Sequence, residues 1–206
     1  LEPAHLSWYE LTIEPNTWFH RHPPQQPDDD ALWAMQSGGK SLLSEHGFEH
    51  YEVSACARHG KQCRHNLNYW QFGDYLGIGA GAHGKVTDAA RQQITRTAKT
   101  RHPGRYLEAA HSTQRISSST VLSAGDAALE FVMNALRLDS GFTRQAFTEA
   151  TGLPFAYIET PVARALAAGL LTGQDQRLQA TARGQRYLNE LLQYWMPEQA
   201  AHADTR

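Results

Sequence analysis

The side chains best suited to chemistry in this sequence lie between residues 65 and 84. Residues 65–70 read His-Asn-Leu-Asn-Tyr-Trp, and residues 73–84 read Gly-Asp-Tyr-Leu-Gly-Ile-Gly-Ala-Gly-Ala-His-Gly. A neutral imidazole, from His65 or His83, can ligate a metal ion or a haem iron, or carry a proton. Spacing alone favours a simpler interpretation, in which each of the two is a hydrogen-bonded structural histidine.

The glycines at 79–84 match the pattern GxGxxG, which in dinucleotide-binding proteins forms a tight turn from a strand into a helix. Residues 85–88 do not predict a clear helix, and no acidic residue lies about 20 positions on. We therefore expect these glycines, with Gly77, to let the backbone pass close to another segment or to a flat ligand.

The two cysteines, Cys56 and Cys63, have six residues between them. They are too few for a disulfide scaffold, and their spacing does not fit a CxxC redox or zinc motif. Two thiolates also cannot hold a four-cysteine iron-sulfur cluster. Any such cluster has to be held by another part of the molecule.

The composition is that of a globular protein with one or two domains, since 206 residues can enclose a sizeable core. Apolar residues make up 41% and charged residues 19%, which excludes a disordered polyelectrolyte and a coiled coil. No stretch approaches the roughly 18 apolar residues of a membrane span, and no charged-then-apolar leader opens the chain. We expect a soluble, cytoplasmic protein.

The first half predicts alternating strands and helices. We expect a strand at 5–14, a helix from the acids at 28–30 to Gly47, and a strand at 48–55, an order that suggests a βαβ unit. A short strand at 92–97 and a helix at 103–110 follow. Residues 112–125, with the run Ser-Ser-Ser-Thr at 117–120, look like a linker.

The last part predicts three helices and a two-stranded wing, which together describe a winged helix. The helices are expected from Asp126, from Thr143 to Gly152, and from Thr160 to Ala168, with a hairpin at 170–180 and a last helix around 187–192. The third helix offers only Arg164 to nucleic acid, the wing offers Arg177, and residues 116–206 carry seven basic and nine acidic side chains. We therefore expect packing or a protein contact, and no nucleic-acid partner.

Five segments together resemble the C-terminal half of the HemW-type radical-SAM haem chaperone family, often labelled oxygen-independent coproporphyrinogen III oxidase-like. The likeness runs through most of the chain, including 126–195, and its most specific element is HNxxYW followed by GDYLGIGAGAHG. It implies an α/β plus α+β fold, with a partial (β/α) radical-SAM barrel followed by a winged-helix-like C-terminal domain. The segments are 11–17, 51–55, 65–70, 73–84 and 97–101. The implied divisions are the barrel part with the haem motif at 1–111, a linker at 112–125, the winged-helix-like domain at 126–196 and a flexible tail at 197–206.

The resemblance also implies a function in which haem is bound and delivered to recipient haemoproteins such as respiratory enzymes. Carried over residue by residue, His65 is implied as the axial ligand of the haem iron, with Asn66, Tyr69 and Trp70 shaping the site. Aromatic rings would cover the apolar macrocycle. The stretch 84–115 carries seven basic and two acidic side chains, and it would receive the haem propionates through Arg96, Lys99 and Arg101. The simpler interpretation of this charge is a protein surface that faces only water.

The chain also departs from the family. Full-length members hold a [4Fe-4S] cluster and S-adenosylmethionine, but nothing here corresponds to the CxxxCxxC cysteines of their N-terminal half. The resemblance therefore implies no cluster ligands, no catalytic residues and no radical chemistry in this chain alone. With barrel strands near 6–14 and 48–55 exposing their edges, we expect a less stable fragment unless a partner supplies the missing N-terminal half, or a homodimer forms.

Two other functions stay open from the sequence. One is the substrate-side half of an oxygen-independent coproporphyrinogen III oxidase-like enzyme, which decarboxylates propionates oxidatively. The other is an inactive truncated remnant. The HNxxYW string favours the chaperone over the enzyme, whereas the missing cysteines leave the remnant open.

Overall fold

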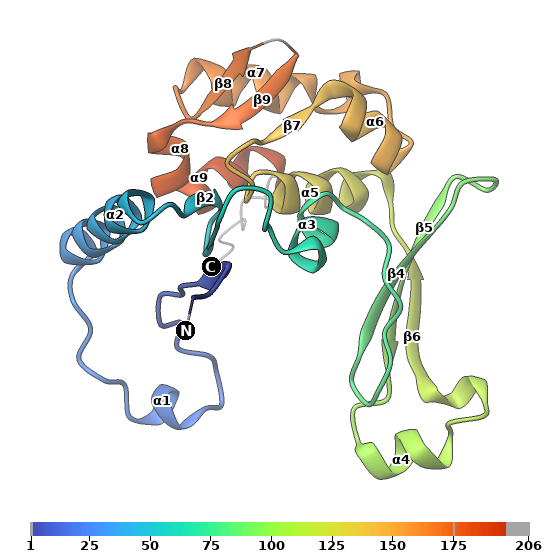
Figure 1. Cartoon of the computed structure of the whole chain (residues 1–206). Helices are drawn as coiled ribbons and strands as arrows, with labels where there is room; N and C mark the ends of the chain where they lie inside the picture. The colour runs from blue at the N-terminus through green and yellow to red at the C-terminus, as the bar shows by residue number, and fades with distance from the viewer. Residues whose placement is uncertain (1, 175, 197–206) are drawn as a thin grey trace, which may run out of the picture. The chain divides into compact units, whose positions relative to one another are not determined.

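The computed structural model describes residues 2–174 and 176–196, and the chain divides into two compact units, residues 1–64 and 65–206. Figure 1 follows the chain through both units. The tail expected at 197–206 lies outside the described residues. None of the described helices is long and apolar enough to cross a membrane.

The first unit contains a small antiparallel sheet and one long helix. The predicted βαβ order is wrong in its pairing, because β3 lies between β1 and β2 and runs antiparallel to each. The segment 48–55, which was expected to be a single strand, reverses its direction after Glu52. The Glu52 carboxylate accepts the backbone N–H of Ser54 at 3.1 Å within the turn. A turn this short is enough to join two antiparallel strands. The elements are β1 His5–Ser7, α1 Trp18–Arg21, α2 Asp29–Glu45, β2 Glu49–Glu52 and β3 Ala55–Ala57.

Helix α2 begins where the acidic residues predicted it. The Asp28 carboxylate accepts the backbone N–H of Ala31 at 2.8 Å and so caps the first turn. The helix ends before Gly47, which has a φ of 77°. The strand predicted at 5–14, in contrast, ends at Ser7.

The second unit begins with α3 and a three-stranded antiparallel sheet in the order β4-β5-β6. The predicted linker at 112–125 is wrong in its middle, because β6 pairs along β5, with Thr120 opposite Arg96. A strand at the edge of a sheet tolerates exposed serines, so composition alone resembled a linker. Figure 1 shows α4 at the end of the sheet where β5 stops and β6 starts. These elements are α3 Arg64–Trp70, β4 His83–Asp88, β5 Gln93–Lys99, α4 Pro103–Glu108, η1 Thr113–Arg115 and β6 Ile116–Val121.

The rest of the second unit is mostly helical, with a third antiparallel sheet in the order β7-β9-β8. The hairpin predicted at 170–180 is confirmed, as are the Thr143 cap, at 3.0 Å from the Ala146 N–H, and the helix end at Gly152. The elements are α5 Ala124–Ala135, β7 Phe142–Thr143, α6 Arg144–Thr151, η2 Phe155–Ile158, α7 Glu159–Ala167, β8 Leu171–Gln174, β9 Arg177–Ala180, α8 Ala182–Arg186, α9 Leu188–Leu192 and η3 Gln193–Trp195.

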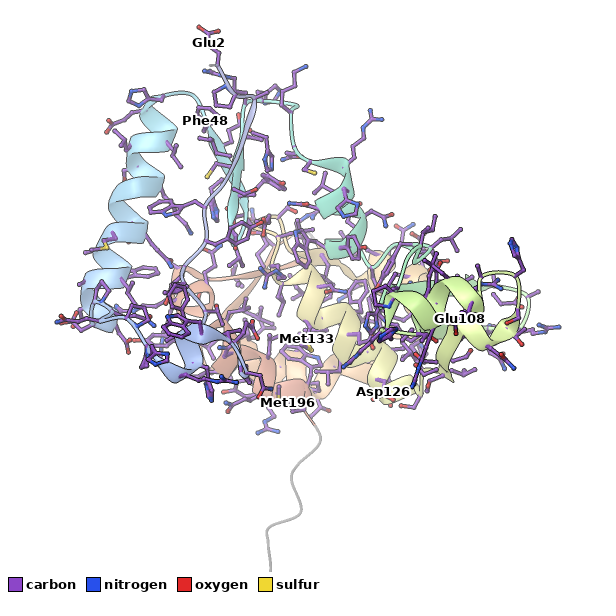
Figure 2. All side chains as sticks on the ribbon, turned by 90° about the horizontal axis from the view of Figure 1, so that it is seen from below. Glu2, Phe48, Glu108, Asp126, Met133 and Met196 are labelled. Atoms are coloured by element: carbon purple, nitrogen blue, oxygen red, sulfur yellow. The ribbon has the colours of Figure 1, made fainter. Side chains whose placement is uncertain are left out.

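Helix α5 starts two residues before the predicted Asp126. Ser123 is the cap, since its hydroxyl accepts the Asp126 N–H at 3.1 Å and donates to the Asp126 carboxylate at 2.6 Å. Asp126 thus lies inside the first turn, where its negative charge also favours the helix dipole. In Figure 2, Asp126 and Met133 mark this helix and Glu108 marks α4.

The core of the second unit centres on Phe131 of α5. Its ring makes edge-to-face contacts with Phe72, Phe142 and Phe147, at centroid distances of 5.9, 5.2 and 5.3 Å. All four rings are buried. Because Phe72 directly follows α3, this packing holds the helix with the HNxxYW motif against the C-terminal helices.

Candidate functional site

The HNxxYW motif forms helix α3, in which residues four apart lie on the same face. His65 and Tyr69 are such a pair, and their rings meet edge to face at a centroid distance of 4.8 Å. The His65 side chain is exposed and Tyr69 is half-buried. The helix therefore presents an accessible imidazole that a neighbouring ring orients.

The ring contact continues from Tyr69 to Tyr75, with a centroid distance of 4.5 Å. Tyr75 belongs to the glycine-rich segment, so the structure brings the two motifs together in a row of three rings, His65, Tyr69 and Tyr75. Sequence reasoning did not assign Tyr75 to the site. Its place in the string GDYLG was the available signal, but only the ring contact gives it a role.

Trp70 lies apart from this row. The Arg137 guanidinium lies 4.4 Å from the centre of the Trp70 ring, and the buried Trp70 Nε1–H has no hydrogen-bond partner among the residues that the structure describes. Trp70 lines a cavity of about 570 Å³ with Phe72, Phe131 and other residues, and neither His65 nor Tyr69 lines it. Asn66, four residues before Trp70, is half-buried. The four predicted residues therefore divide between two faces of α3.

The glycine-rich segment is held against the sheet through its main chain. Tyr75 and Lys85 exchange two backbone hydrogen bonds of 2.9 Å, and the Gly81 N–H donates to the Thr100 carbonyl at 3.0 Å. A Cβ on Gly77 would collide with the His83 carbonyl. The predicted close backbone approach is therefore confirmed at Gly77 and Gly84, whereas nothing in the described structure crowds Gly79. Because strand β4 follows these glycines in place of a helix, the segment does not have the dinucleotide-binding geometry.

Lys85 and Asp74 form an ion pair, and each is a neighbour of Tyr75 in the ring row, Asp74 in sequence and Lys85 through its backbone pairing. Lys85 Nζ donates to Asp74 Oδ1 at 2.7 Å, although the Lys85 side chain is only 2% exposed. Thr87 adds its N–H at 2.7 Å and its hydroxyl at 2.8 Å to the same carboxylate. Burial by itself would raise the pKa of Asp74, but the Lys85 ammonium and the Thr87 donors outweigh it and hold that pKa below its usual value.

Arg96 joins the sheet to helix α5. Its guanidinium donates to the Glu130 carboxylate, with Nε at 2.9 Å from Oε2, and to the Tyr75 hydroxyl. Burial by itself would lower the pKa of Arg96, but the Glu130 charge and the Tyr75 oxygen raise it overall. Glu130 and Tyr75 already take three of the five N–H donors of Arg96, which leaves Lys99 and Arg101 as the better candidates for the predicted propionate contact. Glu130 lies outside the basic stretch, so a count of local charge did not reveal it.

The described residues do not fit an iron-sulfur cluster. Cys56 is buried in β3, and within residues 2–174 and 176–196 no three His, Cys, Asp or Glu side chains gather where they could hold a metal ion. Axial ligation of haem needs a single exposed imidazole, since the porphyrin supplies the other ligands. His65 carries an exposed imidazole, and so does His83 at the start of β4.

Three comparisons place this architecture among known proteins. Residues 122–187 match the model of the HemN C-terminal domain. The heme chaperone HemW of Escherichia coli (strain K12) is 48% identical over 203 residues, covering 96% of this chain and 51% of the relative, and that of Haemophilus influenzae is 43% identical, covering 97% and 51%. A solved structure of coproporphyrinogen III oxidase (HemN) from Escherichia coli, a radical SAM enzyme, aligns with a TM-score of 0.67 at 14% identity, covering 94% of this chain and 48% of that one.

The fold is that of HemN, in a mixed α/β chain with a HemN C-terminal domain at residues 122–187. The chain is a homologue of the HemW-type haem chaperones, which confirms the resemblance found in its sequence. It spans about half the length of the curated relatives it matches.

Proposed function

We propose that this chain binds haem through His65 and helps to deliver it to haemoproteins. The observation that carries the proposal is the row of His65, Tyr69 and Tyr75, which offers an exposed imidazole beside aromatic rings in a homologue of heme chaperone HemW. A neutral imidazole nitrogen is an ordinary axial ligand for haem iron. The neighbouring rings supply apolar surface for the macrocycle.

The remaining motif residues act through the helix. Trp70 packs its ring against Arg137, and Asn66 lies on the same side of α3. Together they keep the helix in place, so the face with His65 and Tyr69 stays turned to the ligand. An exposed ligand suits a chaperone, because bound haem has to leave again for a recipient such as a respiratory enzyme.

The finer divisions of the fold belong to the same proposal. We assign residues 1–111 to the C-terminal part of a radical-SAM (β/α) barrel and residues 126–196 to a winged-helix-like domain. The likeness to the HemN fold supports the first, and helices α5, α6 and α7 with the sheet β7-β9-β8 support the last. The N-terminal half of the family, or a second copy of this chain, would cover the edges of the barrel strands. The [4Fe-4S] cluster and S-adenosylmethionine would be held by a full-length protein. The proposed location is the cytoplasm.

A haem titration tests the proposal. Ferric haem is added to the purified chain and to the His65→Ala variant while the Soret band and the oligomeric state are followed. Saturable binding that His65→Ala abolishes is the expected result. His83→Ala is the matched control, because His83 is exposed in the same unit, and its binding should equal that of the unchanged chain. Equal or non-saturating uptake by the chain and by His65→Ala would overturn the proposal.

A further inference from the structure

We infer that Glu130 of the HemN C-terminal domain positions the haem-binding face of α3, acting through Arg96 and Tyr75. The inference rests on the proposed function, because it concerns the same site. It assigns Glu130 a positioning role, since its carboxylate touches neither of the motif rings.

The contacts form one continuous series from α5 to α3. The Glu130 carboxylate accepts from Arg96 Nε and Nη2, and Arg96 Nη1 donates to the Tyr75 hydroxyl. The Tyr75 ring then contacts Tyr69, which contacts His65. Each step is a direct contact between two side chains.

The sheet sets the geometry of the middle step. Tyr75 is paired with Lys85, and Lys85 with Arg96, so the three residues are neighbours across adjacent segments of the sheet. Side chains paired in this way project from the same face of a sheet. Lys85 pairs with Asp74, and Arg96 donates to both Tyr75 and Glu130.

The charge of Glu130 is what fixes Arg96. A guanidinium that donates two hydrogen bonds to one carboxylate has the orientation of its plane fixed. A single contact between two charges does not fix that plane. The Arg96 and Glu130 side chains are each 29% exposed, so water screens the pair only partly. Without that charge Arg96 loses its fixed plane, the Tyr75 hydroxyl loses its oriented donor, and the rings of Tyr69 and His65 occupy a wider range of rotamers.

The test compares Glu130→Gln and Tyr75→Phe in the haem titration. Glu130→Gln keeps the shape of the side chain but removes its charge, and Tyr75→Phe keeps the ring but removes the acceptor of Arg96. We expect each variant to weaken haem affinity about fivefold, the factor that corresponds to one hydrogen bond. The Soret maximum of the bound ferric haem should also shift toward that of free ferric haem, because imidazole ligation is looser. The double variant should bind no worse than either single variant, since both break the same series.

Glu159→Gln is the matched control, because Glu159 pairs with Arg144 at 3.8 Å in the same domain. Its affinity and Soret maximum should equal those of the unchanged chain. If His65→Ala abolishes binding while Glu130→Gln and Tyr75→Phe match Glu159→Gln in both readouts, this inference fails and the proposed function stands. If His65→Ala binds like the unchanged chain, the proposed function itself fails. Should Glu130→Gln unfold, Tyr75→Phe alone decides, because its ring still fills the same space.

Discussion

The ammonium group of Lys85 lies 2.7 Å from the carboxylate of Asp74 and 4.2 Å from the centre of the Phe72 ring. Lys85 is almost completely buried, whereas the Asp74 side chain is 43% exposed. The pair connects strand β4 to the turn that follows α3. It therefore holds the segment that carries Tyr75 beside the helix that carries His65.

Asp74→Asn is expected to destabilise the second unit by about 2 kcal/mol, because it leaves a buried ammonium without its counter-charge. Lys85→Met should cost less, since the half-exposed Asp74 keeps water and the two Thr87 donors while the methionine fills the space. Urea unfolding of both variants measures the difference. A larger loss for Lys85→Met would contradict this account of the pair.

The contribution of Asp74 should also depend on pH. Its pKa is lower in the folded state than in the unfolded chain, so its stabilisation is present above the unfolded value of about 4 and is lost as the pH falls through the folded value. The difference in unfolding free energy between the unchanged chain and Asp74→Asn should therefore shrink on acidification from pH 7 to pH 3. A difference that stays constant over this range would exclude the ion pair as its cause.

Gly77→Ala should destabilise the chain by about 2 kcal/mol, because the new Cβ meets a main-chain carbonyl that has no room to move. Gly125→Ala is the matched control in helix α5. Its Cβ would make only ordinary contacts, at 3.7 Å from the Tyr157 hydroxyl and 3.8 Å from the Ser123 hydroxyl. Alanine there should stabilise by about 0.5–1 kcal/mol. Thermal unfolding of the two variants should shift in opposite directions.

Trp70→Phe separates the two faces of α3. Phenylalanine keeps a ring for Arg137 and removes the unpartnered N–H, so we expect stability to change by less than about 1 kcal/mol. Trp70→Ala should cost about 3–5 kcal/mol. Because Trp70 lies outside the row of His65, Tyr69 and Tyr75, Trp70→Phe should leave haem affinity unchanged in the Soret titration. Lost affinity in a fully folded Trp70→Phe would place the tryptophan against the haem.

The prediction that basic side chains bind the haem propionates now concerns Lys99 and Arg101. Their double alanine variant should weaken haem binding and flatten its dependence on salt concentration, because screened charge pairs lose strength as salt rises. The titration is repeated at low and high salt for the unchanged chain and the variant. Identical salt dependence in the two proteins would assign the propionates elsewhere.

Local signals in the sequence predicted much of the helical part correctly. The Thr143 cap, the helix end at Gly152 and the hairpin at 171–180 follow from residues that act on the few positions next to them. The family resemblance named His65 and Tyr69 together, and helix α3, which the sequence analysis did not predict, brings their rings into contact. The family resemblance came from the same short strings.

Pairing over long sequence separations was decided only by the tertiary structure. Strand β6 was missed because its serines resemble a linker until β5 supplies their hydrogen-bond partners. Arg96 lies 34 residues from Glu130 and 21 from Tyr75, so charge counting along the chain could not find either contact. The sequence by itself determined the start of α2, the Thr143 cap, the helix end at Gly152 and the hairpin, because each depends on residues a few positions away. The packing of sheet against helix decided which charges meet and which imidazole stays exposed, because those contacts depend on how distant segments come together and not on their neighbours in the chain.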